Sequence, residues 1–187
     1  MKVYTFLTDG FETVEALAVI DILRRAGIEV ETVSITGNEQ VCSAQNITVK
    51  ADTLFKAQPV CKEDVLFLPG GPGHKQYNEC KPLLKLLEKH HAEGGRIAAI
   101  CAAPSVLGAA GLLEGRHATC HPGFEEKLTG AITSEDAVVV DGNIITSRGM
   151  GTAIDFGLAI VDCLTDFDEE VVEHVKKGIV YRNFEEV

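Results

Sequence analysis

The sequence predicts an α/β fold in which a mostly parallel β-sheet is covered by helices on both faces. Two observations predict it. Strand-like and helix-like segments alternate along the chain, and the segments DVLFLP and RIAAI are apolar along most of their length. Apolar strands of this kind are typical of parallel sheets, because both of their faces are buried. Alternation with helices is typical of βαβ units, so we expect a three-layer arrangement.

The elements follow from periodicity and from turn residues. Gly27 ends the first helix, the sequence GGPG ends the strand DVLFLP, and Asp141-Gly142 is a hairpin signal between two β-rich runs. The expected elements are, in order, a strand at 2–8, a helix at 13–26, a strand at 28–35, a short hairpin at 41–52, a strand at 64–69, a helix at 80–92, a strand at 96–100, a helix at 104–113, a hairpin at 137–146, and helices at 151–165 and 168–179.

Composition indicates one globular unit. The chain has 187 residues, of which 45% are hydrophobic and 24% charged, and no Pro, Gly or Ser-rich linker divides it. We expect a single domain over residues 1–187. The net charge is −11, and Lys and Arg do not cluster, so nucleic acid and anionic membranes are not expected as partners.

The N-terminal segment and the cysteines indicate a cytoplasmic protein. MKVYTFLTDGFE has only a short apolar run and is interpreted as a first strand rather than a signal peptide, and no run is long enough to span a membrane. The six cysteines include no CxxC pair, and we expect them to be reduced.

Cys101 is the strongest candidate for a nucleophile. It follows the strand RIAAI and precedes the helix expected at 104–113, so it occupies a strand-to-helix turn at the carboxyl edge of the sheet. A helix N-terminus stabilises a thiolate, and we expect the Cys101 pKa to lie well below the free-thiol value of about 8.5. The Ala102 amide is placed to hold an oxyanion, as in a nucleophile elbow. The alternative is a buried, inert cysteine.

Two further segments should end at the same edge, LTDGFETVE and LPGGPGH. Gly70 and Gly71 permit close backbone approach and are candidate oxyanion or substrate-binding positions, although a glycine-rich turn is more often only a turn. Glu15 lies in the first turn of a helix, where the dipole alone explains a carboxylate. If Glu15 touches Cys101, it must be protonated with a raised pKa, and the pair is then poised for proton transfer.

His121 is the one histidine whose position suggests chemistry. In HATCHPG it precedes Pro122 and should be extended, so that its ring reaches the site, although a lone histidine is usually structural or solvated. His74, by contrast, is expected on the surface. No grouping of His, Cys and Asp has metal-ligand spacing, so no metal is expected.

Together these residues resemble the ThiJ/PfpI superfamily, most closely the branch of the Parkinsonism-associated protein deglycase and its bacterial homologues. The resemblance covers nearly the whole chain and implies a flavodoxin-like three-layer α/β/α sandwich, like that of class I glutamine amidotransferases, usually as a homodimer. It also implies that Cys101 is the reactive cysteine, Glu15 the protonated carboxyl beside it and His121 the third site residue, with oxyanion amides at Gly71 and Ala102. The segments that carry it are GFETVEALAVIDILRRAGI, VLFLPGG, AAICAAPSVL, ATCHP, DGNIITSRG and GTAIDFGLAIV.

This resemblance implies glyoxalase or deglycase activity, without a cofactor, on 2-oxoaldehydes such as methylglyoxal or on their protein adducts, with a protective role in oxidative stress. A redox-sensing chaperone, in which a Cys101 sulfinate is stabilised by Glu15, is the alternative. An intracellular cysteine peptidase or amidase is a lesser one, because Ala102 stands where peptidase-like members have histidine. Two other positions depart from the family pattern and leave substrate preference open: Pro72 replaces a polar residue of some deglycase members, and Met150 replaces proline.

Overall fold

A computed structural model describes residues 1–56 and 60–181 of the chain, so the expected domain end at residue 187 lies outside the described residues. The main sheet has seven strands, and every neighbouring pair is parallel except β10 with β11. The mostly parallel sheet that the sequence predicts is confirmed. Its strands, in spatial order, are β10 (Val138–Asp141), β11 (Ile144–Ser147), β7 (Arg96–Ile100), β6 (Val65–Leu68), β1 (Lys2–Leu7), β2 (Glu29–Ser34) and β5 (Thr53–Leu54).

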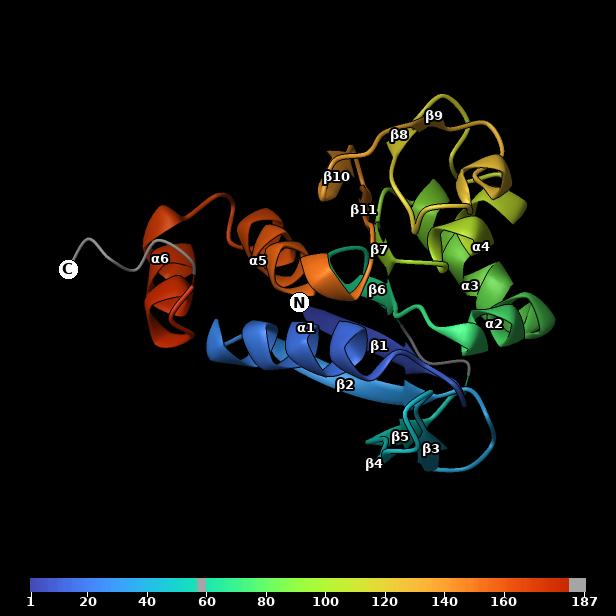
Figure 1. The fold of residues 1–187 in the computed structure, drawn as a ribbon, viewed down its shortest axis with the longest axis horizontal. Coiled ribbons are helices and arrows are strands. Elements are labelled where there is room, and N and C mark those ends of the chain that lie inside the picture. The colour runs from blue at the N-terminus through green and yellow to red at the C-terminus, as the bar shows by residue number, and fades with distance from the viewer. Residues whose placement is uncertain (57–59, 182–187) are drawn as a thin grey trace.

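Helices cover both faces of this sheet, which gives the expected three layers (Figure 1). One face packs against α1 (Thr13–Arg25) and α5 (Ala153–Leu164), and α6 (Glu169–Gly178) packs against α5. The other packs against α2 (Lys75–Glu79), α3 (Lys81–Ala92) and α4 (Pro104–Ala109). Short 3-10 turns complete the connections: η1 (Pro72–His74), η2 (Glu125–Lys127) and η3 (Met150–Thr152).

The central strands are apolar because both of their faces are buried. In β6, Val65 and Phe67 belong to the core beneath α1 and α5, whereas Leu66 and Leu68 belong to the core beneath α3 and α4. All four side chains are fully buried. Burial of each such side chain contributes roughly 1.5–3 kcal/mol to the free energy of unfolding. Because alternate side chains of β6 point to opposite faces, this strand contributes to both cores.

Helices α1 and α5 pack closely because Gly157 lies at their contact. A Cβ atom at Gly157 would come within 2.9 Å of the Ile22 Cδ1 atom. Any larger residue at position 157 would push α5 away from α1 or force Ile22 to move. The close approach matters for function, because α1 begins beside the candidate site described below.

Two pairs of strands form antiparallel hairpins, as the sequence predicts. β3 (Gln40–Cys42) pairs with β4 (Thr48–Lys50), and β10 pairs with β11 across Asp141-Gly142. A third small pair, β8 (His117–Ala118) with β9 (Ile132–Thr133), is parallel and was not expected from the sequence. It positions the loop that carries His121.

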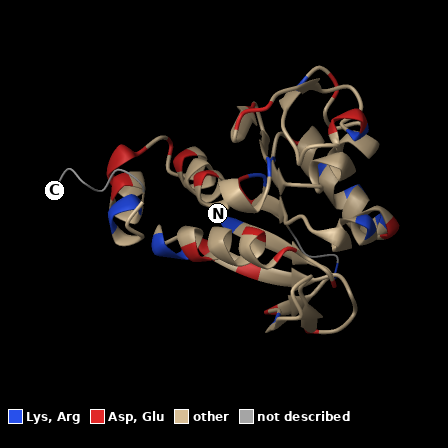
Figure 2. Cartoon of the chain, viewed as in Figure 1, with Lys and Arg blue, Asp and Glu red and all other residues tan. Residues whose placement is uncertain are grey.

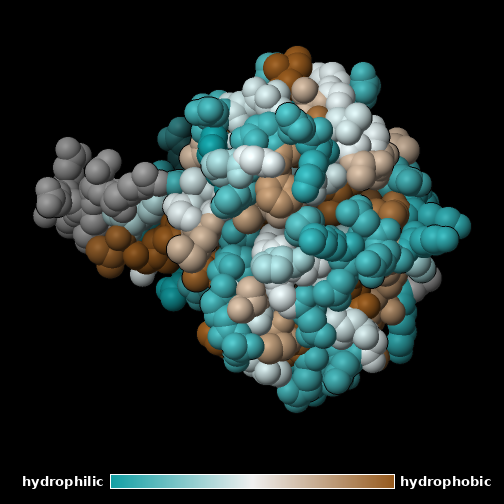
Figure 3. Space-filling model, turned by 45° about the vertical axis from the view of Figure 1, so that its right-hand side comes forward, coloured by the Kyte–Doolittle hydropathy of each residue, from teal (hydrophilic) through white to brown (hydrophobic). Residues whose placement is uncertain are grey.

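Charged residues are dispersed over the molecule. Lys and Arg positions are scattered among the more numerous Asp and Glu positions (Figure 2). On the face drawn in Figure 3, hydrophilic residues cover most of the surface and apolar residues form separate spots. Within residues 1–56 and 60–181, none of the helices has the length and apolar character needed to cross a bilayer.

Candidate active site

Loops from the carboxyl ends of four strands meet at one edge of the sheet. The Glu12 amide donates to the Gly70 carbonyl at 3.0 Å, which joins the loop after β1 to the loop after β6. The Cys101 amide donates to the Ser147 carbonyl at 2.9 Å, which joins the turn after β7 to the end of β11. The three segments expected to meet at this edge therefore do so, and the segment that follows β11 joins them.

Cys101 occupies the turn between β7 and α4 in a left-handed conformation, with φ of +65°. Few residues other than glycine adopt this conformation, which costs on the order of 1–3 kcal/mol and is concentrated at functional sites. The side chain is half-buried. The backbone amides of Gly71 and Ala102 lie close enough to the sulfur to lower its pKa. Amides so placed are the candidate donors to an oxygen on a carbon that the sulfur attacks.

Glu15 lies directly beside this sulfur. It is in the first turn of α1, its side chain is almost completely buried, and its Oε2 atom and the Cys101 Cβ atom both lie 2.6 Å from where a Cβ atom on Gly70 would stand. The Gly70 amide donates to the Oε2 atom at 3.0 Å. The structure therefore brings together the two groups whose contact the sequence left open.

Gly70 supports Glu15 rather than an oxyanion. Its amide is used by the Glu15 carboxyl group, so its assignment as an oxyanion donor is corrected. A Cβ atom at this position would lie 2.6 Å from Glu15 Oε2 and 2.6 Å from the Cys101 Cβ atom. Only glycine leaves room for the two reactive side chains to meet. The adjacent Gly71 has φ of +91°, which glycine adopts freely.

The two side chains titrate as a pair. Burial raises the pKa of Glu15 to about 7, and the contact with Cys101 and the Gly70 amide offset it only in part. Burial and then repulsion by the Glu15 carboxylate raise the pKa of the Cys101 thiol to about 12. Glu15 therefore loses its proton near pH 7, whereas the thiol keeps its proton to much higher pH beside a carboxylate that can accept it.

The low Cys101 pKa expected from a helix N-terminus is therefore wrong. The helix after Cys101 has only six residues and begins at Pro104, three residues beyond the sulfur. Burial and the neighbouring carboxylate outweigh the two amides that favour a thiolate. What prepares the sulfur for attack is a proton acceptor in contact with it.

The contact of Cys101 with Glu15 predicts how alkylation of Cys101 depends on pH. The rate with iodoacetamide should rise through a midpoint near pH 7, because Glu15, once it has lost its proton, can accept the thiol proton as the sulfur attacks. Peptide mapping after timed alkylation measures the rate, with the exposed Cys61 as an internal reference. A Cys101 midpoint at or above the free-thiol value of about 8.5 would contradict assistance by Glu15.

His121 lies next to the pair but does not join it by a hydrogen bond among the described residues. Its backbone amide donates to the Cys101 carbonyl at 2.8 Å, and its ring is exposed. The ring Nδ1 atom lies 2.9 Å from the Pro122 carbonyl and so must carry the proton, which leaves Nε2 free to accept one. The ring and Glu15 approach Gly149 from two sides, each within 3.7 Å of where a Cβ atom would lie.

His74 was expected on the surface and is instead buried, with 7% of its area exposed. Its Nδ1 atom donates to the Gly71 carbonyl at 2.9 Å, and its ring packs edge-on against Phe124. Phe124 in turn contacts the His121 ring. His74 therefore helps to fix the position of Gly71, whose amide lies near the Cys101 sulfur. Nothing in the segment PGHKQY predicts this role.

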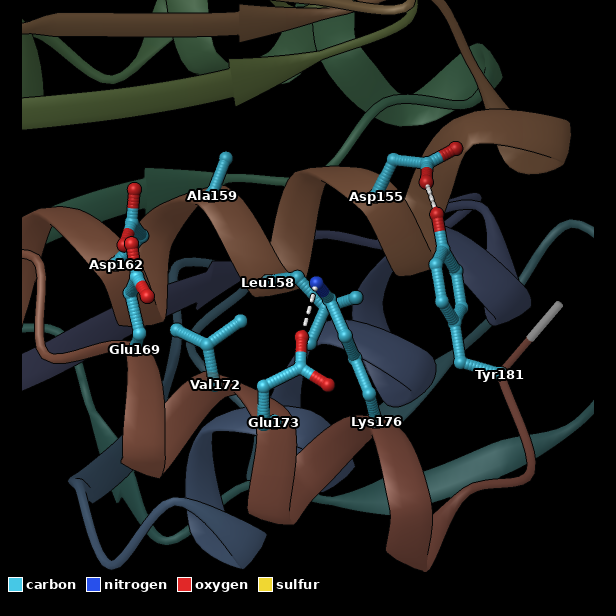
Figure 4. Close-up of a pocket in the computed structure, with 9 residues that line it drawn as sticks. All are labelled: Asp155, Leu158, Ala159, Asp162, Glu169, Val172, Glu173, Lys176 and Tyr181. Carbon is cyan, nitrogen blue, oxygen red and sulfur yellow. Dashed lines mark hydrogen bonds and ion pairs between the residues drawn. The ribbon is translucent and has the colours of Figure 1, made fainter. Parts of the chain in front are cut away.

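A separate cavity of about 560 Å³ lies between α5 and α6, away from Cys101 (Figure 4). Leu158 and Val172 contribute apolar side chains to it, and Glu173 forms an ion pair with Lys176 at 2.8 Å. Tyr181 hydrogen-bonds Asp155 at its other end. None of its lining residues belongs to the Cys101 site.

Comparison with known proteins finds relatives with similar sequences and the same fold. The model of the DJ-1/PfpI family matches residues 1–163. Glutathione-independent glyoxalase DJR-1.2 of Caenorhabditis elegans is 36% identical over 155 residues, which cover 82% of each chain. The solved structure of oxidized Toxoplasma gondii DJ-1 superposes with a TM-score of 0.90 and 34% identity, covering 97% of this chain and 98% of that one.

Some relatives are longer than this chain. Protein DJ-1 homolog B of Arabidopsis thaliana is 40% identical over 173 residues, which are 91% of this chain but 40% of that protein. For Protein DJ-1 homolog A from the same plant, the matched residues make up 45% of that protein. The chain thus spans less than half the length of these two relatives.

Proposed function

Because the chain belongs to the DJ-1/PfpI family, we propose that it is a glyoxalase that converts 2-oxoaldehydes such as methylglyoxal to 2-hydroxy acids without a cofactor. The observation that carries this proposal is the buried Glu15 carboxyl group beside the Cys101 side chain, with a pKa raised to about 7. The similarity to a relative named as a glutathione-independent glyoxalase supports it.

In the first step the sulfur attacks the aldehyde carbon. A carbon–sulfur bond forms, the π electrons move to the aldehyde oxygen, and the amides of Gly71 and Ala102 stabilise the developing negative charge. The thiol proton of Cys101 moves by way of Glu15 to that oxygen. The product is a hemithioacetal, and Glu15 is left ionised beside it.

In the second step a proton moves between adjacent carbons. The Glu15 carboxylate removes the proton from the carbon bonded to sulfur, which gives an enediolate, and then returns that proton to the neighbouring carbon. The hydroxyl proton on the former aldehyde oxygen moves to the neighbouring oxygen in the same step. The former aldehyde carbon is thereby oxidised to a thioester and the former ketone carbon is reduced to an alcohol. His121 Nε2 is the second candidate for this proton transfer.

Hydrolysis completes the cycle. Water attacks the thioester, the 2-hydroxy acid leaves, and the Cys101 thiol is restored. Oxidation at one carbon is balanced by reduction at its neighbour, so the reaction needs no external oxidant or reductant. A half-buried sulfur favours a small free aldehyde over the same group attached to a protein, so deglycase activity on protein adducts is proposed as secondary.

The test is lactate formation from methylglyoxal by the purified, reduced protein without glutathione. We expect stoichiometric lactate at a rate proportional to protein concentration. Loss of methylglyoxal without lactate would contradict the proposal, because it would indicate simple trapping of the aldehyde by thiols and amines.

A redox-sensing function is the second candidate. The solved relative described as oxidized has the same fold, and the buried Glu15 is placed to donate a hydrogen bond to a Cys101 sulfinate. Limited peroxide treatment followed by mass spectrometry would show selective addition of two oxygens to Cys101. Equal oxidation of Cys61 would contradict a sensor role.

A homodimer is also proposed, on the basis of the family resemblance. Val14 on α1 and Ile47 beside β4 are large apolar side chains that are 42% and 48% exposed, and a second copy would cover such residues. Light scattering at micromolar concentration is expected to give twice the chain mass of 20.1 kDa. A mass near 20.1 kDa would contradict the dimer.

A further inference from the structure

Gly149 is a buried glycine at which neither backbone conformation nor packing requires glycine. Its φ of 162° and ψ of −165° are close to fully extended, outside the left-handed region that favours glycine. At Gly149 the atoms nearest to the place of a Cβ atom are 3.7 Å away, which is ordinary van der Waals contact. At the other buried glycines of residues 1–56 and 60–181 an atom lies within 3.0 Å of that place: Gly70, Gly73, Gly95, Gly108 and Gly157.

The space beside Gly149 is bordered by the two candidate proton carriers of the site. The atoms 3.7 Å from the place of a Cβ atom are Glu15 Oε1 and His121 Cδ2. Apart from the chain neighbours of Gly149, no other atom of the described residues lies within 4 Å of it. The Cδ2 atom is bonded to Nε2, the ring nitrogen of His121 that can accept a proton. The missing side chain therefore leaves space between the Glu15 carboxyl group and the His121 ring.

We propose that Gly149 is a specificity-determining residue, because the space left by its missing side chain receives the group on the second carbon of the 2-oxoaldehyde. The inference rests on the proposed function and deepens it, since it identifies the position that decides which 2-oxoaldehydes fit. A methyl group on residue 149 would occupy the space that the methyl group of methylglyoxal needs.

The arrangement of Cys101, Glu15 and Gly149 directs the substrate toward this space. The Cys101 Cβ atom and Glu15 Oε2 lie on the Gly70 side of the carboxyl group, whereas Oε1 faces Gly149. The sulfur holds the first carbon of the substrate, and the carboxyl group must reach both carbons to move a proton between them. The second carbon therefore lies along the carboxyl group toward Gly149, and its substituent enters the space beside the His121 ring.

Hydrogen bonds fix the backbone of Gly149 and so preserve this space. Its amide donates to Thr152 Oγ1 at 3.1 Å, and its carbonyl accepts from the Thr152 amide at 2.9 Å. The Thr152 hydroxyl lies 2.7 Å from the Ser147 hydroxyl, and the Ser147 carbonyl accepts from the Cys101 amide at 2.9 Å. None of these bonds uses the hydrogen atom that alanine would replace, so Gly149→Ala keeps them.

The test compares methylglyoxal, which has a methyl group on its second carbon, with glyoxal, which has a hydrogen atom there. In Gly149→Ala we expect kcat/KM for lactate formation from methylglyoxal to fall by about 10-fold or more relative to kcat/KM for glycolate formation from glyoxal. This is the discrimination typical of one methyl-sized group. A ratio of the two values equal to that of wild type, whether both rates are kept or both fall alike, would overturn the inference.

Gly151→Ala is the matched control for this substitution. Gly151 is exposed and lies two residues further along the same segment, and no atom of the described residues lies within 4 Å of the place of its Cβ atom. It adds the same methyl group outside the space between Glu15 and His121. Its ratio of kcat/KM values should equal that of wild type, and a fall as large as in Gly149→Ala would also overturn the inference.

A second readout does not require turnover. Either aldehyde adds reversibly to the Cys101 thiol as a hemithioacetal and protects it from iodoacetamide, so the concentration that gives half-protection measures binding in the site. In Gly149→Ala this concentration should rise about 10-fold more for methylglyoxal than for glyoxal. Protection of the wild-type protein without lactate formation would contradict the proposed function alone. No protection by methylglyoxal in the wild-type protein would overturn both.

Melting temperature shows whether packing requires glycine at position 149. The Cβ atom of alanine would meet only ordinary contacts, so Gly149→Ala should melt near the wild-type temperature. A Gly149→Ala variant that failed to fold would show that glycine is needed there for structure, and would overturn the inference.

Discussion

Replacement of Cys101 by serine is expected to reduce lactate formation from methylglyoxal by about 10⁴ or more, the effect typical of losing a covalent nucleophile. Serine keeps the size of the side chain and can still hydrogen-bond Glu15 and the amides of Gly71 and Ala102. Its hydroxyl is too weak an acid for the Glu15 carboxylate to deprotonate. The loss should therefore appear in the rate of turnover while the fold is retained, as judged by melting temperature.

Cys61→Ser is the matched control for this substitution. Cys61 is exposed and lies in the loop before β6, away from the Cys101 site. Its replacement should leave lactate formation unchanged. If Cys101→Ser kept more than a tenth of the activity, a group other than Cys101 would be the nucleophile, and the mechanism proposed above would be wrong.

Elements with a strong sequence pattern were predictable. The apolar runs of β6 and β7 and the periodic apolar residues of α1 and α5 are each sufficient to define an element. The short elements β5, β8, β9 and α2, which have no such pattern, were not predicted. Their existence depends on tertiary pairing, which a short segment does not encode by itself.

The helix expected at 104–113 ends earlier, at Ala109. Gly111 has φ of +72° and closes the helix, a conformation typical of glycine just beyond a helix C-terminus. This signal was present in the segment GAAGLL. The small residues of this segment favour a longer helix, but the positive φ of Gly111 ends it.

The site was predictable where a side chain carries the chemistry. Cys101 was identified from its place after a buried strand, and Glu15 from the end of the first strand, because topology brings both to one edge of the sheet. The donor to Glu15 was not predictable, because the Gly70 group that contacts it is a backbone amide. The thiol pKa was wrong for a related reason: burial and contact with Glu15 depend on packing that the sequence does not show.

Replacement of Glu15 by glutamine is expected to lower methylglyoxal turnover by about 10²–10⁴, the usual contribution of a general acid–base group. The glutamine side chain can still accept from the Gly70 amide and donate to the Cys101 sulfur, so the geometry of the site is kept. It cannot take a proton from the hemithioacetal carbon or return one to its neighbour. Lactate formation and the pH profile of Cys101 alkylation in the same preparation measure the two effects.

The alkylation midpoint should also rise in Glu15→Gln, since burial still raises the thiol pKa and no carboxylate shares its proton. Glu12→Gln, which makes the same charge change three residues earlier, is the matched control. Glu12 raises the Glu15 pKa only by its charge, so its removal should lower the midpoint slightly and leave turnover nearly intact.

The pH dependence of protein stability distinguishes a catalytic role of Glu15 from a purely structural one. Because its pKa is raised from 4.5 to about 7, the stability that protonated Glu15 contributes is fully present below about pH 4.5 and lost as pH rises through 7. At pH 8 the wild-type protein buries an ionised carboxylate, at a cost on the order of 3 kcal/mol, whereas glutamine stays neutral. The Glu15→Gln variant should therefore be at least as stable as wild type at pH 8 while turning over far more slowly. If the Glu15→Gln variant kept wild-type turnover, Glu15 would have only the structural role of a carboxylate in the first turn of a helix. His121 would then remain as the candidate base.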